Sequence, residues 1–203
     1  MPSDTMNSEL AARLSETPLR LKELAALLDG LGHDERVTWV RSIGRADQRR
    51  LWQAAAGFLP LALADLVPPA RADGETVRHF GKNTLPAFTH FEKRFCRPAG
   101  QDPRRPAALY GFNFQAMAWL TGPGYYVAHA DPALPEVLID YRELPPAAPA
   151  GWPALRRNEV GAARFVYGFM VDRLRRVSEH VTIGSAARNG KDLGSWFLLT
   201  REG

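Results

Sequence analysis

The sequence predicts an α+β protein in which an N-terminal helical segment precedes an antiparallel β-barrel or strongly curved sheet. Three observations carry this prediction. Residues 8–67 repeat apolar side chains at helical spacing. After residue 76, aromatic and β-branched residues alternate with other residues in short segments separated by turn signals. Between these regions lies PPARADGE, whose Pro, Gly and charges without apolar periodicity indicate a linker. We therefore expect a helical segment over 1–67, a linker over 68–75 and a barrel-like domain over 76–203.

The helical segment is expected to follow a short frayed tail over residues 1–7. Ser8 stands at a capping position for the first helix. Thr17 and Pro18 are typical of the N-cap and the first position of a second helix. Further helical patterns continue to residue 67, and Pro60 should stop or kink the last of them. The second helix carries a continuous apolar stripe, formed by Leu21, Leu24, Leu27, Leu28 and Leu31.

The barrel-like part is expected to consist of several short strands. In ALYGFNFQAMAWL, Tyr110, Phe112 and Phe114 alternate with residues that face the other way. Gly-Pro-Gly then makes a turn, and Asn189-Gly190 is typical of a later hairpin. We expect strands at 107–120, 125–130, 136–144, 163–171, 179–188 and 195–201.

Two segments carry a helical pattern inside this sheet region. Residues 85–96 place Leu85, Phe88, Phe91 and Phe95 at helical spacing, which predicts a helix. His90, Lys93 and Arg94 would then lie near one another on it. Residues 170–180 also show helical spacing but lie between strand-like stretches, so we expect a helical turn within a strand connection.

Composition is typical of a globular protein, with 45% hydrophobic and 24% charged residues in 203. The net charge is +4, and only four of the 26 basic residues are Lys, a bias that a GC-rich genome produces without a charged partner. The lone Cys96 excludes an internal disulfide. We see no signal peptide and no apolar stretch of membrane-spanning length, so we expect a cytoplasmic protein without integral membrane association.

The last forty residues carry a pattern similar to one known group of proteins. A strand leads to "VD.LRRV", then to a strand with "V.IG", then to a final strand ending in "WFLLTR". This pattern resembles small lipocalin-like (calycin-type) barrels of uncharacterised bacterial proteins, although the Gly-x-Trp-x-Gly signature of one such group is absent. The resemblance implies a lipocalin-like antiparallel barrel with a hydrophobic pocket. The matching residues are Val171, Asp172, Leu174, Arg175, Val177, Val181, Ile183, Gly184, Trp196, Phe197, Leu199 and Arg201.

Motifs for several kinds of chemistry are missing. No two His stand four residues apart, and no Cys partner stands at zinc-finger spacing, so we expect no metal. Neither a phosphate-binding loop nor a nucleophile elbow is present, and we expect no cofactor. Lys and Arg do not alternate with aromatic residues on one strand face, so we expect no nucleic-acid partner.

The aromatic residues of the strands instead point to a ligand cavity. Many are Tyr or Trp, which need polar partners when buried, and a mostly apolar cavity with a few polar groups is typical of a small-molecule site. The protein would bind or carry a small hydrophobic molecule, and His90 or Arg94 would meet an acidic head group if the ligand has one. The expected pocket residues are Phe112, Phe114, Trp119, Tyr126, Phe169 and Trp196.

Three alternatives stay open. The same aromatic residues could close-pack into a solid core without a cavity. The cavity could serve a cofactor-free enzyme, such as an isomerase or cyclase, with His90 or His129 as the base. Finally, the helices within residues 8–67 could dock a protein partner, which an exposed apolar stripe over 19–31 would favour.

Overall fold

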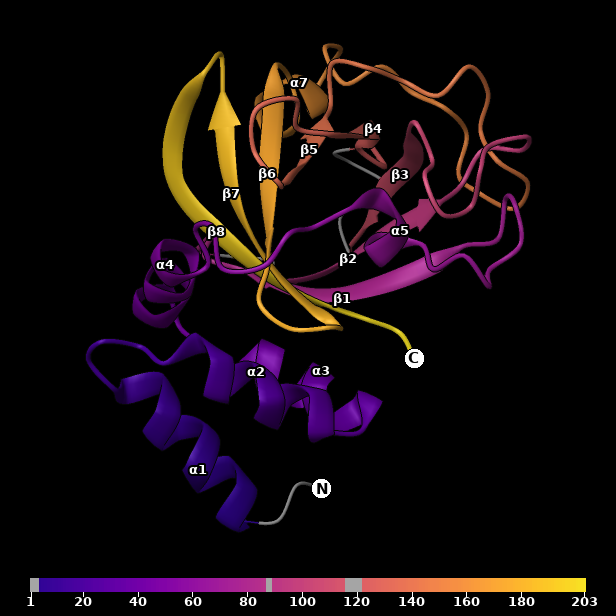
Figure 1. Ribbon diagram of the computed structural model, residues 1–203. Coiled ribbons are helices and arrows are strands. Elements are labelled where there is room, and N and C mark those ends of the chain that lie inside the picture. The colour runs from indigo at the N-terminus through magenta and orange to yellow at the C-terminus, as the bar shows by residue number, and fades with distance from the viewer. Residues whose placement is uncertain (1–3, 87–88, 116–121) are drawn as a thin grey trace.

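The computed structural model describes residues 4–86, 89–115 and 122–203. Within them, N-terminal helices precede eight antiparallel strands that form a closed barrel, each strand pairing with its neighbours in the sequence and the last with the first (Figure 1). The predicted α+β class and the antiparallel barrel are therefore confirmed. The strands are β1 (Val77–Asn83), β2 (His90–Cys96), β3 (Leu109–Phe114), β4 (Tyr125–Ala130), β5 (Val137–Asp140), β6 (Met170–Arg176), β7 (Val181–Arg188) and β8 (Lys191–Arg201).

The strand register decides which side chains enter the barrel. Lys93 pairs with Asn113 and Gly111 with Tyr126, so these residues share the inner face. Large rings fit there because glycines lie opposite them: a Cβ placed on Gly111 would lie 2.0 Å from Cε2 of Tyr126, and one on Gly184 would lie 2.2 Å from Cζ of Phe197. This alternation of small and large residues fills the interior of a small barrel.

Four helices cover the outside of one part of the barrel: α1 (Asp4–Ser15), α2 (Leu21–Gly30), α3 (His33–Ser42) and α4 (Arg45–Ala54). They share one apolar cluster with outward side chains of β7 and β8, among them Val181, Ile183 and Leu198. Figure 1 shows α1, α2 and α3 together on one side of the barrel, with α4 next to β8. The helices thus bury an apolar sheet face that would otherwise be exposed to water.

A fifth helix, α5 (Leu63–Leu66), belongs to the barrel interior instead. Leu63 and Leu66 lie in the same apolar cluster as inward residues of β1, β2 and β3, such as Val77 and Phe95. The backbone carbonyl of Leu66 lies 2.9 Å from Nε2 of the buried His79. This segment covers the end of the barrel at which β1 begins.

The structure corrects the helix predicted over 85–96, of which residues 87–88 lie outside the described residues. Residues 90–96 form strand β2, in which Phe91, Lys93 and Phe95 face inward while Glu92 and Arg94 face outward. Within β2 a period of two accounts for Phe91 and Phe95 together with the charged residues between them, whereas Phe88 lies outside the described residues.

Further boundaries differ from the sequence predictions. α1 begins at Asp4, so Ser8 lies inside the helix and residues 4–7 belong to it instead of to a frayed tail. Residues 163–171 divide into the short helix α7 (Ala163–Val166) and the start of β6, and β6 continues as a strand to Arg176 where a helical turn was expected. The second helix begins at Leu21, with Arg20 rather than Thr17 as its N-cap. The division into 1–67, 68–75 and 76–203 stays a prediction.

Candidate functional site

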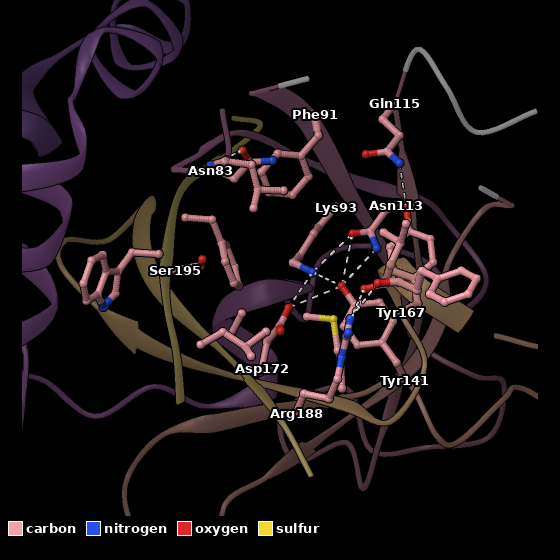
Figure 2. Close-up of a pocket in the computed structure, with 18 residues that line it drawn as sticks. Asn83, Phe91, Lys93, Asn113, Gln115, Tyr141, Tyr167, Asp172, Arg188 and Ser195 are labelled. Carbon is pink, nitrogen blue, oxygen red and sulfur yellow. Dashed lines mark hydrogen bonds and ion pairs between the residues drawn. The ribbon is translucent and has the colours of Figure 1, made fainter. Parts of the chain in front are cut away.

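A cavity of about 290 Å³ lies inside the barrel, at the end opposite α5. Its wall is mostly apolar, with Phe91, Met170 and Phe197 among the side chains that line it. α7 and the beginning of β8 contribute the outer part of the lining (Figure 2). The volume stands at the low end of the range for small-molecule sites, which begins at roughly 300 Å³.

A buried polar cluster stands in this apolar wall. It consists of Lys93 from β2, Asn113 from β3, Tyr141 directly after β5, and Asp172 from β6. Each of the four is at most 4% exposed. Figure 2 shows their polar ends converging at the centre of the cavity. We refer to these four residues as the polar cluster.

Lys93 makes the central contacts of the polar cluster. Its Nζ donates to Oδ1 of Asn113 at 3.2 Å, to the hydroxyl of Tyr141, and to Oδ2 of Asp172 at 3.2 Å. Nδ2 of Asn113 donates to the hydroxyl of Tyr141 at 2.9 Å. Lys93, Asn113 and Asp172 point inward from three different strands and Tyr141 follows a fourth, so barrel closure is what brings them together.

Aromatic rings surround the ammonium of Lys93. Its Nζ lies 5.0 Å from the ring centroid of Tyr126 and 4.9 Å from those of Tyr141 and Phe197. Such distances allow cation–π attraction, which is strongest where water is excluded. Phe197 and Tyr126 are themselves buried, so the ammonium lies out of contact with water, between aromatic rings and its polar partners.

Burial sets the protonation of the polar cluster. It lowers the pKa of Lys93, an effect that the Asp172 carboxylate partly offsets. It raises the pKa of Asp172, which the neighbouring ammonium partly offsets. It also holds the pKa of Tyr141 well above the usual value, with the charge of Asp172 adding to the effect. The neutral forms of lysine and aspartic acid are therefore brought closer in free energy to the ion pair.

One acceptor of the polar cluster has no partner. Oδ1 of Asp172 is buried and accepts no hydrogen bond from any residue that the structure describes. Leaving a buried acceptor unsatisfied costs about 1–3 kcal/mol, and more for a charged group.

Polar residues also lie farther along the cavity. Nε2 of Gln115 donates to the hydroxyl of Tyr167 at 2.8 Å, and the Tyr167 ring stacks on that of Tyr141 with centroids 5.4 Å apart. Nη2 of Arg188 donates to the backbone carbonyls of Phe165 and Val166. These contacts tie α7 to the barrel and present a guanidinium to the cavity.

Two of the sequence-predicted pocket residues lie inside or at the edge of this site. Trp196 lines the cavity. Tyr126 lies deeper, fully buried, where its hydroxyl donates to the backbone carbonyl of Arg94 at 3.2 Å and its ring flanks Lys93.

The structure does not bring the other predicted residues that it describes to the cavity. Phe112 faces outward and packs on Trp152 at 4.7 Å between centroids. Trp152 belongs to the Pro-rich loop over residues 141–162, between β5 and α7. Phe114 is exposed beneath the guanidinium of Arg94, which lies 4.0 Å from its ring.

Two more of these residues are exposed, and one is not described. His90 is exposed at the start of β2, and Phe169 is 40% exposed. Trp119 lies outside the described residues. His129, the other candidate base, pairs with Glu143 at 3.0 Å on the outer face. The eight-residue site and the roles given to it stay predictions.

The expected site residues did not include Asn113 or Tyr141, and Asp172 was quoted only as part of the resemblance. Lys93 was expected beside His90 and Arg94 on a helix, and only His90 and Arg94 were assigned to the site. A signal for Lys93 was available, because a charged residue between Phe91 and Phe95 at alternate positions is typical of a strand with one polar group on an apolar face. Asp172 gives the same signal between Met170 and Leu174, whereas Asn113 and Tyr141 give none, and the proximity of all four depends on strand order.

The described residues also bear on metals and membranes. They contain no group of three or more His, Cys, Asp or Glu side chains arranged to hold a metal ion. None of the helices in the described part of the chain is long and apolar enough to span a bilayer. Comparisons with protein-family models, curated proteins and solved structures found no match to this chain.

Proposed function

We propose that the protein binds a small, largely hydrophobic molecule inside the barrel. The observation that carries this proposal is the cavity with apolar walls, which all four residues of the buried polar cluster also line. Small-molecule sites combine these two features, because apolar walls provide affinity and a few polar groups fix the orientation. Eight-stranded barrels have room for one small ligand.

The polar cluster favours a neutral polar group on the ligand. Lys93 and Asp172 together carry no net charge, so a carboxylate would gain little from them. If the ligand does carry a carboxylate, Arg188 is the cation placed to meet it, because Arg188 lines the cavity whereas His90 and Arg94 do not. Arg188 would thereby take the role that the sequence assigned to His90 or Arg94.

The first experiment is mass spectrometry on an organic extract of gently purified protein. We expect a small hydrophobic molecule in stoichiometric amount. In an Ala186→Phe variant, the added ring would occupy the cavity that Ala186 lines, and the molecule should be lost. A Phe114→Ala variant is the matched control, since Phe114 lies on the outer face, and it should retain the molecule.

Two results would count against binding in the cavity. The extract could contain nothing in stoichiometric amount, and purified Ala186→Phe could bind added hydrophobic probes as tightly as wild type does. Equal loss of the molecule in Phe114→Ala and Ala186→Phe would instead place the binding site elsewhere.

A cofactor-free enzyme is the second candidate, and the polar cluster is the observation that favours it. Lys93, Asp172 and Tyr141 offer a base and an acid within hydrogen-bond reach of one another, inside the cavity. His129 has a carboxylate partner, but on the outer face. Turnover of the extracted molecule by wild type, and its loss in Tyr141→Phe, would support an enzyme over a carrier.

No comparable observation supports the third alternative, in which the N-terminal helices bind a protein partner. The apolar stripe of α2 is buried against its neighbours, since Leu24 and Leu28 are fully inaccessible. An exposed stripe was the observation expected to favour a protein partner.

A further inference from the structure

Lys93 is placed unlike the other lysines of this chain. Lys22 and Lys191 are exposed and Lys82 is partly exposed, whereas the Lys93 amine ends inside the apolar cavity. It lies 3.2 Å from a buried carboxylate, and the hydroxyl of Tyr141 contacts both groups. An amine with an acid–base partner in an enclosed apolar site is the arrangement that allows a lysine to act as a nucleophile towards carbonyl compounds.

We propose that Lys93 captures a hydrophobic aldehyde or ketone as a covalent imine inside the barrel. This proposal rests on the proposed binding of a hydrophobic molecule in the same cavity, and it names the chemical class of that molecule.

The contacts of Lys93 explain how the amine would become available. A lysine must lose a proton before it attacks a carbonyl, and in water this is rare at neutral pH. Here burial lowers the pKa of Lys93 and raises that of Asp172, so transfer of the proton from one to the other is much less unfavourable than in solvent.

The reaction balances without an oxidant or reductant. Asp172 takes one proton from the ammonium, the free amine forms a bond to the carbonyl carbon, and the carbonyl oxygen receives that proton. Asp172 then takes a second proton from the nitrogen and gives it to the new hydroxyl. The hydroxyl leaves as water while the nitrogen lone pair forms the C=N bond. The products are a protonated imine on Lys93, a carboxylate on Asp172 and one water molecule.

The ion pair also explains why such an imine would persist. The protonated imine keeps a positive charge at Nζ, so the carboxylate of Asp172 and the rings of Tyr126 and Phe197 continue to stabilise it. The apolar wall restricts the access of water, which hydrolyses imines exposed to solvent.

Octanal is a suitable probe, because it combines an aldehyde with an apolar chain. The whole purified chain is incubated with octanal at neutral pH, the imine is reduced with cyanoborohydride, and modified lysines are mapped by peptide mass spectrometry. With four lysines in the sequence, the assignment is unambiguous. We expect one octyl group, on Lys93, at a rate exceeding that of the other lysines by about tenfold for each unit by which its pKa is lowered.

Variants test the assignment. Lys93→Met should abolish this fast labelling, whereas Lys82→Met is the matched control and should be labelled as wild type. Because loss of Lys93 alone leaves Asp172 buried and unpaired, the double variant Lys93→Met/Asp172→Asn provides a second test in a chain without the buried charges. Labelling spread evenly over the lysines, or unchanged in either Lys93 variant, would overturn the proposal.

Octanol distinguishes imine capture by Lys93 from the binding of a hydrophobic molecule in the cavity, on which that proposal rests. It has the same chain without the carbonyl, and its binding is measured by calorimetry. If octanol binds to wild type and not to Ala186→Phe while octanal does not modify Lys93, imine capture is wrong and the cavity still binds hydrophobic molecules. If neither octanol nor octanal binds, the proposed function is wrong as well.

Discussion

At the scale of single residues, the Lys93–Asp172 pair is held where water can hardly solvate it, with side-chain exposures of 2% and 4%. Removing one member of a buried pair leaves an uncompensated charge and costs about 3–5 kcal/mol, while replacing both by neutral groups of similar shape is often tolerated. The pair is therefore a weak source of net stability. The proposed binding of a small molecule would account for the pair's position at the cavity.

This argument gives a first prediction. Lys93→Met should lower the free energy of unfolding by about 3–5 kcal/mol, and adding Asp172→Asn should restore most of that loss. Urea denaturation of wild type, both single variants and the double variant measures the coupling. A double variant whose loss equals the sum of the single losses would show that the two charges do not stabilise one another.

His79 provides a second prediction, on pH dependence. The pKa of its ring is lowered from 6.5 to about 3, mainly by full burial; the hydrogen bond to the carbonyl of Leu66 opposes this shift, and the charges of Arg201 and Lys93 contribute to it. Below pH 6.5 the unfolded chain binds a proton at His79 that the folded chain does not. The contribution of His79 to the free energy of unfolding is therefore fully present above pH 6.5 and is lost as the pH decreases towards 3. Between pH 7 and 5 this single group should cost about 2 kcal/mol of unfolding free energy.

The control for this prediction is His79→Gln, which keeps a donor for the carbonyl of Leu66 but does not titrate. Urea denaturation at both pH values should show a smaller loss in the variant than in wild type. If wild type and the variant lose the same free energy of unfolding, His79 is protonated to the same extent in the folded and the unfolded chain.

At the scale of elements, the periodicity of the sequence predicts strands but not which face of each strand is the inner one. In β3 the sequence predicts that the aromatic face, with Phe112 and Phe114, lines the pocket. The structure instead turns Asn113 inward, and Trp152 from the Pro-rich loop covers Phe112 outside. A loop some forty residues away along the chain thus provides the apolar partner, and no local pattern could indicate this.

The same strand gives a third prediction. Gly111 allows the ring of Tyr126 to lie directly on the backbone, so a methyl group at that position would overlap Cε2 and Cζ of the ring. Gly111→Ala should therefore destabilise the barrel by about 1–3 kcal/mol, the usual cost of overpacking. Thermal unfolding followed by circular dichroism measures the shift.

Gly30→Ala is the matched control. Gly30 is the last residue of α2, and a Cβ there would have no atom within 4 Å. Because alanine favours the helix more than glycine, this variant should be neutral or stabilised by up to about 1 kcal/mol. Equal effects of the two substitutions would show that the close approach of Tyr126 to Gly111 is not what excludes a side chain.

At the scale of the whole molecule, two apolar clusters join regions that the sequence presents as separate. Leu63 and Leu66 precede the expected linker and yet pack with the barrel interior. Val181, Ile183 and Leu198 lie on strands and yet pack with α1 to α4. Local patterns predicted the N-terminal helices and most of the later strands, though not β1 or β2, whereas these contacts depend on the strand order around the closed barrel.

These shared clusters predict that helices and barrel unfold together. Two signals can be followed during urea denaturation: far-UV circular dichroism, which the helices dominate, and the protection of strand amides from hydrogen exchange. Both should change at the same urea concentration, in a single transition. Leu198→Ala, at the contact between β8 and the helices, should shift both signals equally and cost about 2–5 kcal/mol, as for other fully buried leucines. If the helical signal is lost at lower urea while the strands stay protected, residues 1–67 form a separate unit. The barrel would then have to remain folded with Val181, Ile183 and Leu198 exposed to water. We do not expect this, because these side chains are buried against the helices and exposing them costs free energy.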